Sequence, residues 1–171
     1  FLKDNINPSW CLYLLILKLI YLTLILQVIS NKPFQFKNFK VNQDKTAMKV
    51  GTDGVLLGAW CSLESLPKTI LDIGTGTGII SLMLAQRSSA ITIDGVEVDP
   101  SAYMQTVDNF ENSDWSDRLY CYNTSFQKFV DDTNKETYDL IVSNPPFYTE
   151  DYITKNSSRN KARFTSSLTF K

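Results

Sequence analysis

The sequence predicts an α/β domain with a mostly parallel sheet and helices on both of its faces. Short apolar runs alternate with helix-like segments between residues 69 and 143, which is the order that a parallel sheet requires. A glycine-rich turn follows the first of these runs, and a pair of prolines follows the last. The composition agrees with one globular domain, because 43% of the 171 residues are apolar and 20% are charged.

The N-terminal segment differs in character from the rest of the chain. Residues 10–29 are almost entirely apolar and long enough to span a bilayer, but Lys18 lies near their middle, where a bilayer would penalise its charge. Three interpretations are possible: a membrane anchor, a signal-like segment, or an upstream stretch that does not belong to the functional domain. We favour the last, so residues 1–30 are set apart from a domain of residues 31–171, and membrane association is not expected.

A short strand pair and a helix are expected before the alternating region. Three phenylalanines alternate with three lysines, a pattern that predicts two strands with a basic outer face. These residues are Phe34, Phe36, Phe39, Lys32, Lys37 and Lys40. Thr52, Asp53 and Gly54 are expected to cap a helix over residues 55–60.

The alternating region supplies four strands and two helices. Strands are expected over residues 69–73, 91–98, 119–122 and 138–143, and helices over residues 79–86 and 100–112. Pro100 suits the first position of the second helix. In the strand order 3-2-1-4 the first and fourth strands are neighbours, and ligands bind at their carboxyl ends. The residues after Ser143 are polar and give no clear strand, so we expect a sheet truncated after its fourth strand.

The turn after the first strand is the sharpest local feature. It places Asp72 before Gly74, Gly76 and Gly78. Gly74 permits a tight turn, Gly76 lets a ligand approach the backbone, and Gly78 lets the next helix pack closely. The GxGxG spacing is not the GxGxxG of a pyrophosphate site, and an acid would repel a pyrophosphate. These details favour a cationic ligand such as S-adenosylmethionine, with a turn that binds no ligand as the alternative.

An acidic residue, Glu97, ends the second strand. A carboxylate at this place can accept hydrogen bonds from two ribose hydroxyls. The alternative is an acid that caps the following helix, but that function suits Asp99 better, because Glu97 is embedded in a Val-Glu-Val strand end. We therefore expect Glu97 to bind a cofactor ribose.

The fourth strand runs into Asn144, Pro145, Pro146 and Phe147. The prolines have fixed φ angles and no N–H donor, so this loop presents rigid carbonyls. The side-chain oxygen of Asn144 and the carbonyl of Pro145 can each accept a hydrogen bond from an amino group, which orients the nitrogen for attack on a methyl group. Phe147 can stack on a planar base, which would have to be flipped or unstacked. The alternative is a strand exit that the prolines only stiffen.

The composition excludes several kinds of chemistry. The chain has no histidine, which removes Ser-His-Asp and Cys-His catalysis and His-containing zinc sites. The cysteines Cys11, Cys61 and Cys121 are far apart and fit reduced thiols in a cytoplasmic protein. We expect no metal site. The net charge of −1 also means that any nucleic acid must be bound by local patches.

Three of these motifs resemble those of a known class of enzyme. Residues 72–78, Glu97 and residues 144–147 resemble motifs I, II and IV of class I S-adenosylmethionine-dependent methyltransferases that act on amino groups. The runs MKVGTDGVLLGAW and RNKARF are more specific, and they resemble the bacterial tRNA adenine-N6 methyltransferases. The resemblance extends over about residues 34–168. It implies a Rossmann-like fold, S-adenosylmethionine as methyl donor, and an anticodon-loop adenine of tRNA1(Val) as acceptor.

The resemblance also indicates where this sequence departs from its relatives. Many of them carry an aspartate after the third strand that binds the cofactor adenine, and Ser125 stands in that place here as a weaker acceptor. Basic side chains that could hold RNA phosphates occur on either side of the core, at Lys37, Lys40, Arg159, Lys161 and Arg163. Guanine N2 in rRNA, a protein glutamine amide, and an inactive cofactor-binding fragment remain the alternatives.

Overall fold

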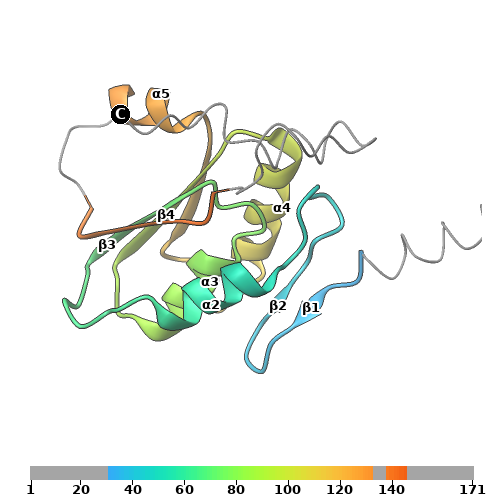
Figure 1. Ribbon diagram of the computed structural model, residues 1–171, viewed down its shortest axis with the longest axis horizontal. Coiled ribbons are helices and arrows are strands. Elements are labelled where there is room, and N and C mark those ends of the chain that lie inside the picture. The colour runs from blue at the N-terminus through green and yellow to red at the C-terminus, as the bar shows by residue number, and fades with distance from the viewer. Residues whose placement is uncertain (1–30, 133–137, 146–171) are drawn as a thin grey trace, which may run out of the picture. The chain divides into compact units, whose positions relative to one another are not determined.

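The computed structural model describes residues 31–132 and 138–145 (Figure 1). The chain divides into two compact units, Phe1–Lys32 and Pro33–Lys171, and the architecture below is that of the second. The apolar residues 10–29 lie outside the described part. Within that part, no helix combines the length and the apolar character that a membrane crossing needs.

Within the described residues, four parallel strands form the central sheet, in the order β5-β4-β3-β6. They are β3 (Thr69–Ile73), β4 (Thr92–Glu97), β5 (Leu119–Asn123) and β6 (Leu140–Ser143). The predicted parallel sheet and its strand order are confirmed. The register sets Ile73 opposite both Val96 and Ser143, so β4, β3 and β6 end at nearly the same level.

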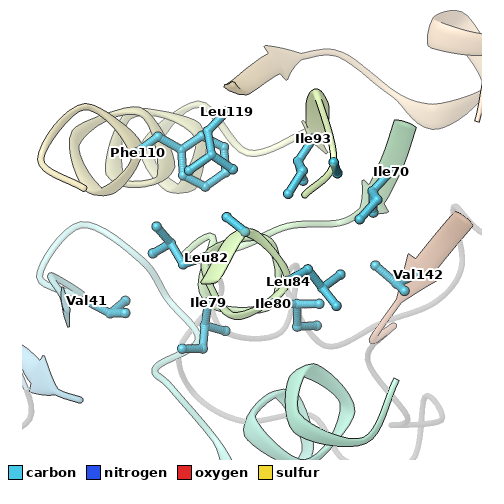
Figure 2. Close-up of a cluster of buried hydrophobic side chains, with 12 residues drawn as sticks. Val41, Ile70, Ile79, Ile80, Leu82, Leu84, Ile93, Phe110, Leu119 and Val142 are labelled. Atoms are coloured by element: carbon cyan, nitrogen blue, oxygen red, sulfur yellow. The ribbon is translucent and has the colours of Figure 1, made fainter. Parts of the chain in front are cut away.

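One face of the sheet packs against α3 (Ile79–Arg87) and α4 (Pro100–Glu111). Ile70 and Ile93 project from the sheet toward Leu82 of α3 and Phe110 of α4, and Figure 2 shows these side chains converging. α2 (Thr52–Trp60) lies beside α3 in Figure 1 and approaches it closely at Gly58. A Cβ at Gly58 would lie 2.7 Å from the sulfur of Met83.

The opposite face of the sheet packs against α5 (Phe126–Asp132). Neighbouring strand residues point to opposite faces, so Leu71 and Val96 lie away from the first cluster and contact Phe129 of α5. Helices on both faces are therefore confirmed. α5 was not predicted, although Phe126, Phe129 and Val130 have helical spacing.

A two-stranded antiparallel hairpin precedes the sheet, as predicted, with β1 (Phe34–Gln35) and β2 (Lys40–Val41). The rings of Phe36 and Phe39 stack with their centroids 4.6 Å apart, and Phe39 meets Trp115 edge-on. These contacts, together with the fully buried Val41, attach the hairpin to the core.

The predicted start of α2 was wrong. Thr52, Asp53 and Gly54 belong to the helix itself, and Gly51 is the N-cap residue, with no side-chain capping bond. The backbone carbonyl of Gly51 accepts the first helical bond, from the amide of Val55. The helix therefore begins directly after the extended Gly51, and no Thr or Asp side chain caps it.

Candidate functional site

The candidate site lies where three neighbouring strands end. The glycine loop, residues 74–78, follows β3, while Glu97 ends β4 and Asn144 comes directly after β6. Because β3 pairs with both β4 and β6, the topology brings these three features together at the switch point of the sheet, as predicted. Ser143 strengthens the junction, since its hydroxyl donates to the carbonyl of Ile73 at 2.9 Å.

The glycine loop leaves one side open and packs tightly on the other. Gly74, Gly76 and Gly78 all have positive φ angles, between 61° and 78°. A Cβ at Gly74 would meet no atom within 4 Å, whereas a Cβ at Gly78 would lie 2.7 Å from the ring of Phe110. The close packing predicted for Gly78 is confirmed, and the open side at Gly74 allows a ligand to approach the backbone.

Asp72 supports the loop from beneath, because its side chain has no exposed surface. Its Oδ2 accepts hydrogen bonds from the hydroxyls of Thr75, at 2.8 Å, and Ser81, at 2.7 Å. Its Oδ1 is buried and makes no hydrogen bond within the described part of the chain. Burial raises the pKa of Asp72 to about 6, although the two hydroxyl donors oppose that rise. No feature of the sequence indicated that Thr75 and Ser81 would donate hydrogen bonds to Asp72.

Replacing Asp72 with asparagine is expected to change how stability depends on pH. The raised pKa means that folded Asp72 holds its proton more tightly than the unfolded chain, whose reference pKa is 3.8. Its contribution to the free energy of unfolding therefore decreases as the pH rises from about 4 through 6. The difference between wild type and variant should change by about 3 kcal/mol across that window, as measured by urea denaturation. The same substitution at the exposed Asp117 is the control. If the free energies of unfolding of wild type and Asp72→Asn differed by the same amount at every pH, the prediction would be contradicted.

Glu97 is held at the end of β4 by two backbone amides. Its Oε2 accepts from the amide of Gly76 at 3.0 Å, and its Oε1 accepts from the amide of Asp99 at 2.9 Å. The side chain is only 9% exposed, and burial raises its pKa while these amides lower it. Asp99 caps α4 by accepting from the amides of Ser101 and Ala102. The capping function therefore belongs to Asp99, as the sequence analysis favoured, and the Glu97 carboxylate is anchored beside the glycine loop.

The end of β5 is bonded to the backbone of Glu97. The side chain of Asn123 and the amide of Thr124 both donate to the carbonyl of Glu97. Ser125 caps α5, since its hydroxyl accepts from the amide of Lys128 at 3.2 Å. Val98 follows Glu97 and is 65% exposed, so it offers an apolar surface next to the carboxylate. Val98 was not among the predicted site residues, although an apolar residue directly after the acidic strand end is visible in the sequence.

Asn144 faces the first turn of α2. A Cβ at Gly54 would lie 3.8 Å from its side-chain nitrogen, so this turn forms one wall beside Asn144. The other predicted residues of this motif and of the second basic cluster lie outside the described residues: Pro146, Phe147, Arg159, Lys161 and Arg163. Lys37 and Lys40 are exposed on the β1–β2 hairpin.

Neither a metal centre nor a reactive thiol emerges among the residues that the structure describes. In residues 31–132 and 138–145, no three His, Cys, Asp or Glu side chains are placed to hold a metal ion. Cys61 and Cys121 are free thiols. Burial raises the pKa of Cys121 to about 12, so its thiol is a poor nucleophile at neutral pH. The glycine loop, the Glu97 carboxylate and Asn144 are the groups that the described residues bring together at this site.

A parallel sheet of this order, with a glycine loop and an acidic strand end at its switch point, defines a Rossmann-like α/β protein. The chain is similar in fold to the crystal structure of a Pyrococcus horikoshii transferase, with a TM-score of 0.50 and 20% identity over 59% of this chain and 38% of the other. The chain belongs to the methyltransferase small domain family, which it matches over residues 51–161.

Three proteins that are similar in sequence share one name. A tRNA1(Val) (adenine(37)-N6)-methyltransferase of Christiangramia forsetii is 61% identical over 81% of this chain and 58% of its own length. Proteins of the same name are 60% identical in Flavobacterium psychrophilum, over 80% of this chain and 58% of the relative, and 47% identical in Haemophilus influenzae, over 77% and 56%. The chain thus spans a little more than half the length of these relatives.

Proposed function

We propose that this chain is part of a methyltransferase that uses S-adenosylmethionine to methylate the exocyclic N6 of adenine 37 in tRNA1(Val). One observation carries the proposal: β3 and β6 are paired, so Asn144, which follows β6, comes next to the glycine loop, which follows β3. This arrangement sets a group that can orient an amino nitrogen beside a loop that can hold a cofactor. The shared name of the similar proteins supports the same reaction and acceptor. Residues 31–171 would form the methyltransferase part of the chain.

The cofactor-binding residues fit S-adenosylmethionine. The open side at Gly74 and Gly76 leaves room for the ligand against the backbone. Each oxygen of Glu97 accepts one backbone hydrogen bond and retains a lone pair for a ribose hydroxyl. Val98 would offer its exposed side chain to the adenine face, and Ser125 would stand in for the aspartate with which many relatives bind the adenine. When bound, the cofactor supplies an electrophilic methyl group on a cationic sulfonium.

The acceptor is positioned by Asn144 and Pro145. The amide oxygen of Asn144 and the carbonyl of Pro145 would accept hydrogen bonds from the two N–H groups of the adenine amine. Their acceptance turns the nitrogen lone pair toward the cofactor side of the site, and such positioning supplies most of the rate that the protein must add. Pro146 stiffens the loop, and Phe147 would stack on the flipped base.

Basic side chains would hold the RNA. Lys37 and Lys40 are exposed on the hairpin, and Arg159, Lys161 and Arg163 follow the Asn-Pro-Pro-Phe motif in the sequence. Contacts of this kind with phosphates make affinity decrease steeply with salt concentration. A tRNA-modifying protein of this kind would act in the cytoplasm, where its substrate is found.

Replacing Glu97 with glutamine is expected to weaken binding of S-adenosylhomocysteine by roughly 30- to 100-fold, because a charge-assisted acceptor for ribose and for the Gly76 amide is lost. Isothermal titration measures this effect without any RNA. The same substitution at exposed Glu111, at the end of α4, is the matched control. A dissociation constant within about twofold of wild type in the folded Glu97→Gln protein would exclude the ribose function.

Transfer of labelled methyl groups tests the proposal as a whole. This chain and a version extended to the full length of its relatives are each incubated with S-adenosylmethionine and total tRNA, followed by nucleoside analysis. N6-methyladenosine at position 37 of tRNA1(Val) is the expected product. Label in rRNA guanine or in a protein glutamine would reassign the acceptor, and binding of cofactor without any transfer would indicate a cofactor-binding fragment.

A further inference from the structure

The inner side of α4 carries three polar side chains that are almost completely buried. Gln105, Thr106 and Asn109 are at most 2% exposed. Buried polar groups destabilise a fold unless they find hydrogen-bond partners, so the partners of these side chains reveal what the helix holds in place. Apart from a bond of Thr106 to the carbonyl of Ala102 within α4, the partners of these side chains are backbone atoms of two segments that are far apart in the sequence, the glycine loop and residues 42–45.

Asn109 binds both segments with one amide group. Its Oδ1 accepts from the amide of Asn42, and its Nδ2 donates to the carbonyl of Asn42 and to the carbonyl of Thr77, each at 2.8 Å. Both N–H groups of the amide are therefore used. Thr77 lies in the glycine loop directly before Gly78, and Asn42 directly follows β2.

Neighbouring side chains of α4 hold one segment each. The hydroxyl of Thr106 donates to the carbonyl of Gly76 at 2.8 Å, on the loop side. Gln105 accepts from the amide of Lys45 at 2.7 Å, and Asp108 forms an ion pair with the same lysine. Asn109 thus joins two sets of contacts that would otherwise be separate.

We propose that Asn109 is a positioning residue that locks the glycine loop and residues 42–45 into one arrangement, so that a cofactor bound at the loop also orders this segment. The inference rests on the proposed function for the identity of the cofactor. The segment links the hairpin that carries Lys40 to the first turn of α2, which lies against Asn144. Ordering of residues 42–45 by the cofactor would therefore prepare the acceptor side of the site, and by linkage an acceptor would strengthen cofactor binding.

Amide hydrogen exchange in the cofactor-free chain tests the lock directly. The probes are the amides of Lys45 and Gly76, which bond to Gln105 and Glu97 rather than to Asn109. Asn109→Asp keeps the acceptor for Asn42 but places an oxygen against two carbonyls, and Asn109→Ser shortens the side chain without adding charge. Each variant should speed exchange at both probes by about tenfold, the equivalent of one net hydrogen bond. Exchange that changes at neither probe or at one alone would overturn the proposal.

Asn112→Asp provides the matched control. Asn112 is the C-cap residue of α4, and its side chain bonds only the carbonyl of Asp108 among the described contacts. The Asn112→Asp variant should therefore exchange as wild type does at both probes. Urea denaturation of each variant shows that the measurements are made on folded protein. A general loss of stability would speed exchange at all slow amides, including those of β3, and that uniform result would also count against a specific lock.

Addition of S-adenosylhomocysteine tests the coupling. In wild type, saturating ligand should slow exchange at Gly76 and also at Lys45, and in Asn109→Asp the protection at Lys45 should be lost. Protection of Gly76 with unchanged exchange at Lys45 in wild type would overturn the coupling. Protection of neither amide in wild type would instead contradict the proposed cofactor, while the ligand-free comparison would still decide whether Asn109 joins the two segments.

Discussion

Replacing Asn144 with alanine is expected to lower kcat for methyl transfer by about 10²- to 10³-fold, the usual effect of removing a preorganised hydrogen-bonding group from an active site. Asn144 follows β6, and its side chain lies against the first turn of α2. It takes no part in the Asp72 and Glu97 hydrogen bonds that hold the glycine loop. Binding of S-adenosylhomocysteine should therefore stay within about twofold of wild type. Single-turnover transfer at saturating cofactor, with isothermal titration in parallel, separates the two effects.

Two further substitutions sharpen the interpretation of that result. Asn144→Asp keeps an acceptor oxygen of the same reach, so it should retain more transfer than Asn144→Ala. Asn112→Ala removes an amide from the exposed end of α4 and should leave transfer unchanged. Wild-type turnover in Asn144→Ala would show that this side chain does not orient the acceptor amine.

Replacing Gly78 with alanine is expected to destabilise the fold by about 3 kcal/mol. Two terms contribute, because the φ of +78° is strained for any residue with a Cβ, by about 1–2 kcal/mol, and the new atom would lie 2.7 Å from the buried ring of Phe110. Overpacking of this kind typically costs about 1–3 kcal/mol. Urea denaturation measures the sum, and loss of cofactor binding should accompany it because the loop must shift.

Two other glycines separate these terms. Gly74→Ala has a similar φ of +71° but no atom within 4 Å of the new Cβ, so it should show the backbone cost alone. Gly54→Ala lies inside α2 with ordinary contacts at 3.5 and 3.8 Å, and it should stabilise the fold by up to about 1 kcal/mol. A Gly78→Ala protein no less stable than Gly74→Ala would show that Phe110 yields to the added methyl group.

Much of the fold, and the meeting of three predicted features at one edge of the sheet, followed from the sequence alone. The strands β3, β4 and β6 are short runs rich in apolar residues that end next to a glycine, an acid and a pair of prolines, and such local signals act over a few residues. Their order placed the glycine loop, Glu97 and Asn144 at one edge of the sheet, because right-handed connections between parallel strands leave few alternatives. The start of α2 escaped this reasoning, since Thr and Asp commonly cap helices and only the extended backbone of Gly51 shows where this one begins.

The tertiary structure alone decided which buried polar groups pair. Asp72 takes its hydrogen bonds from Thr75 and Ser81, and Asn109 bonds Asn42 across 67 positions and Thr77 across 32. Serine, threonine and asparagine side chains are short and can bond to any backbone or carboxylate group that lies within about 3 Å. Sequence spacing determines such neighbours only within a helix or strand. Between elements, the neighbours depend on how the helices pack on the sheet, so the hydrogen bonds of Thr75, Ser81 and Asn109 became visible only in the folded chain.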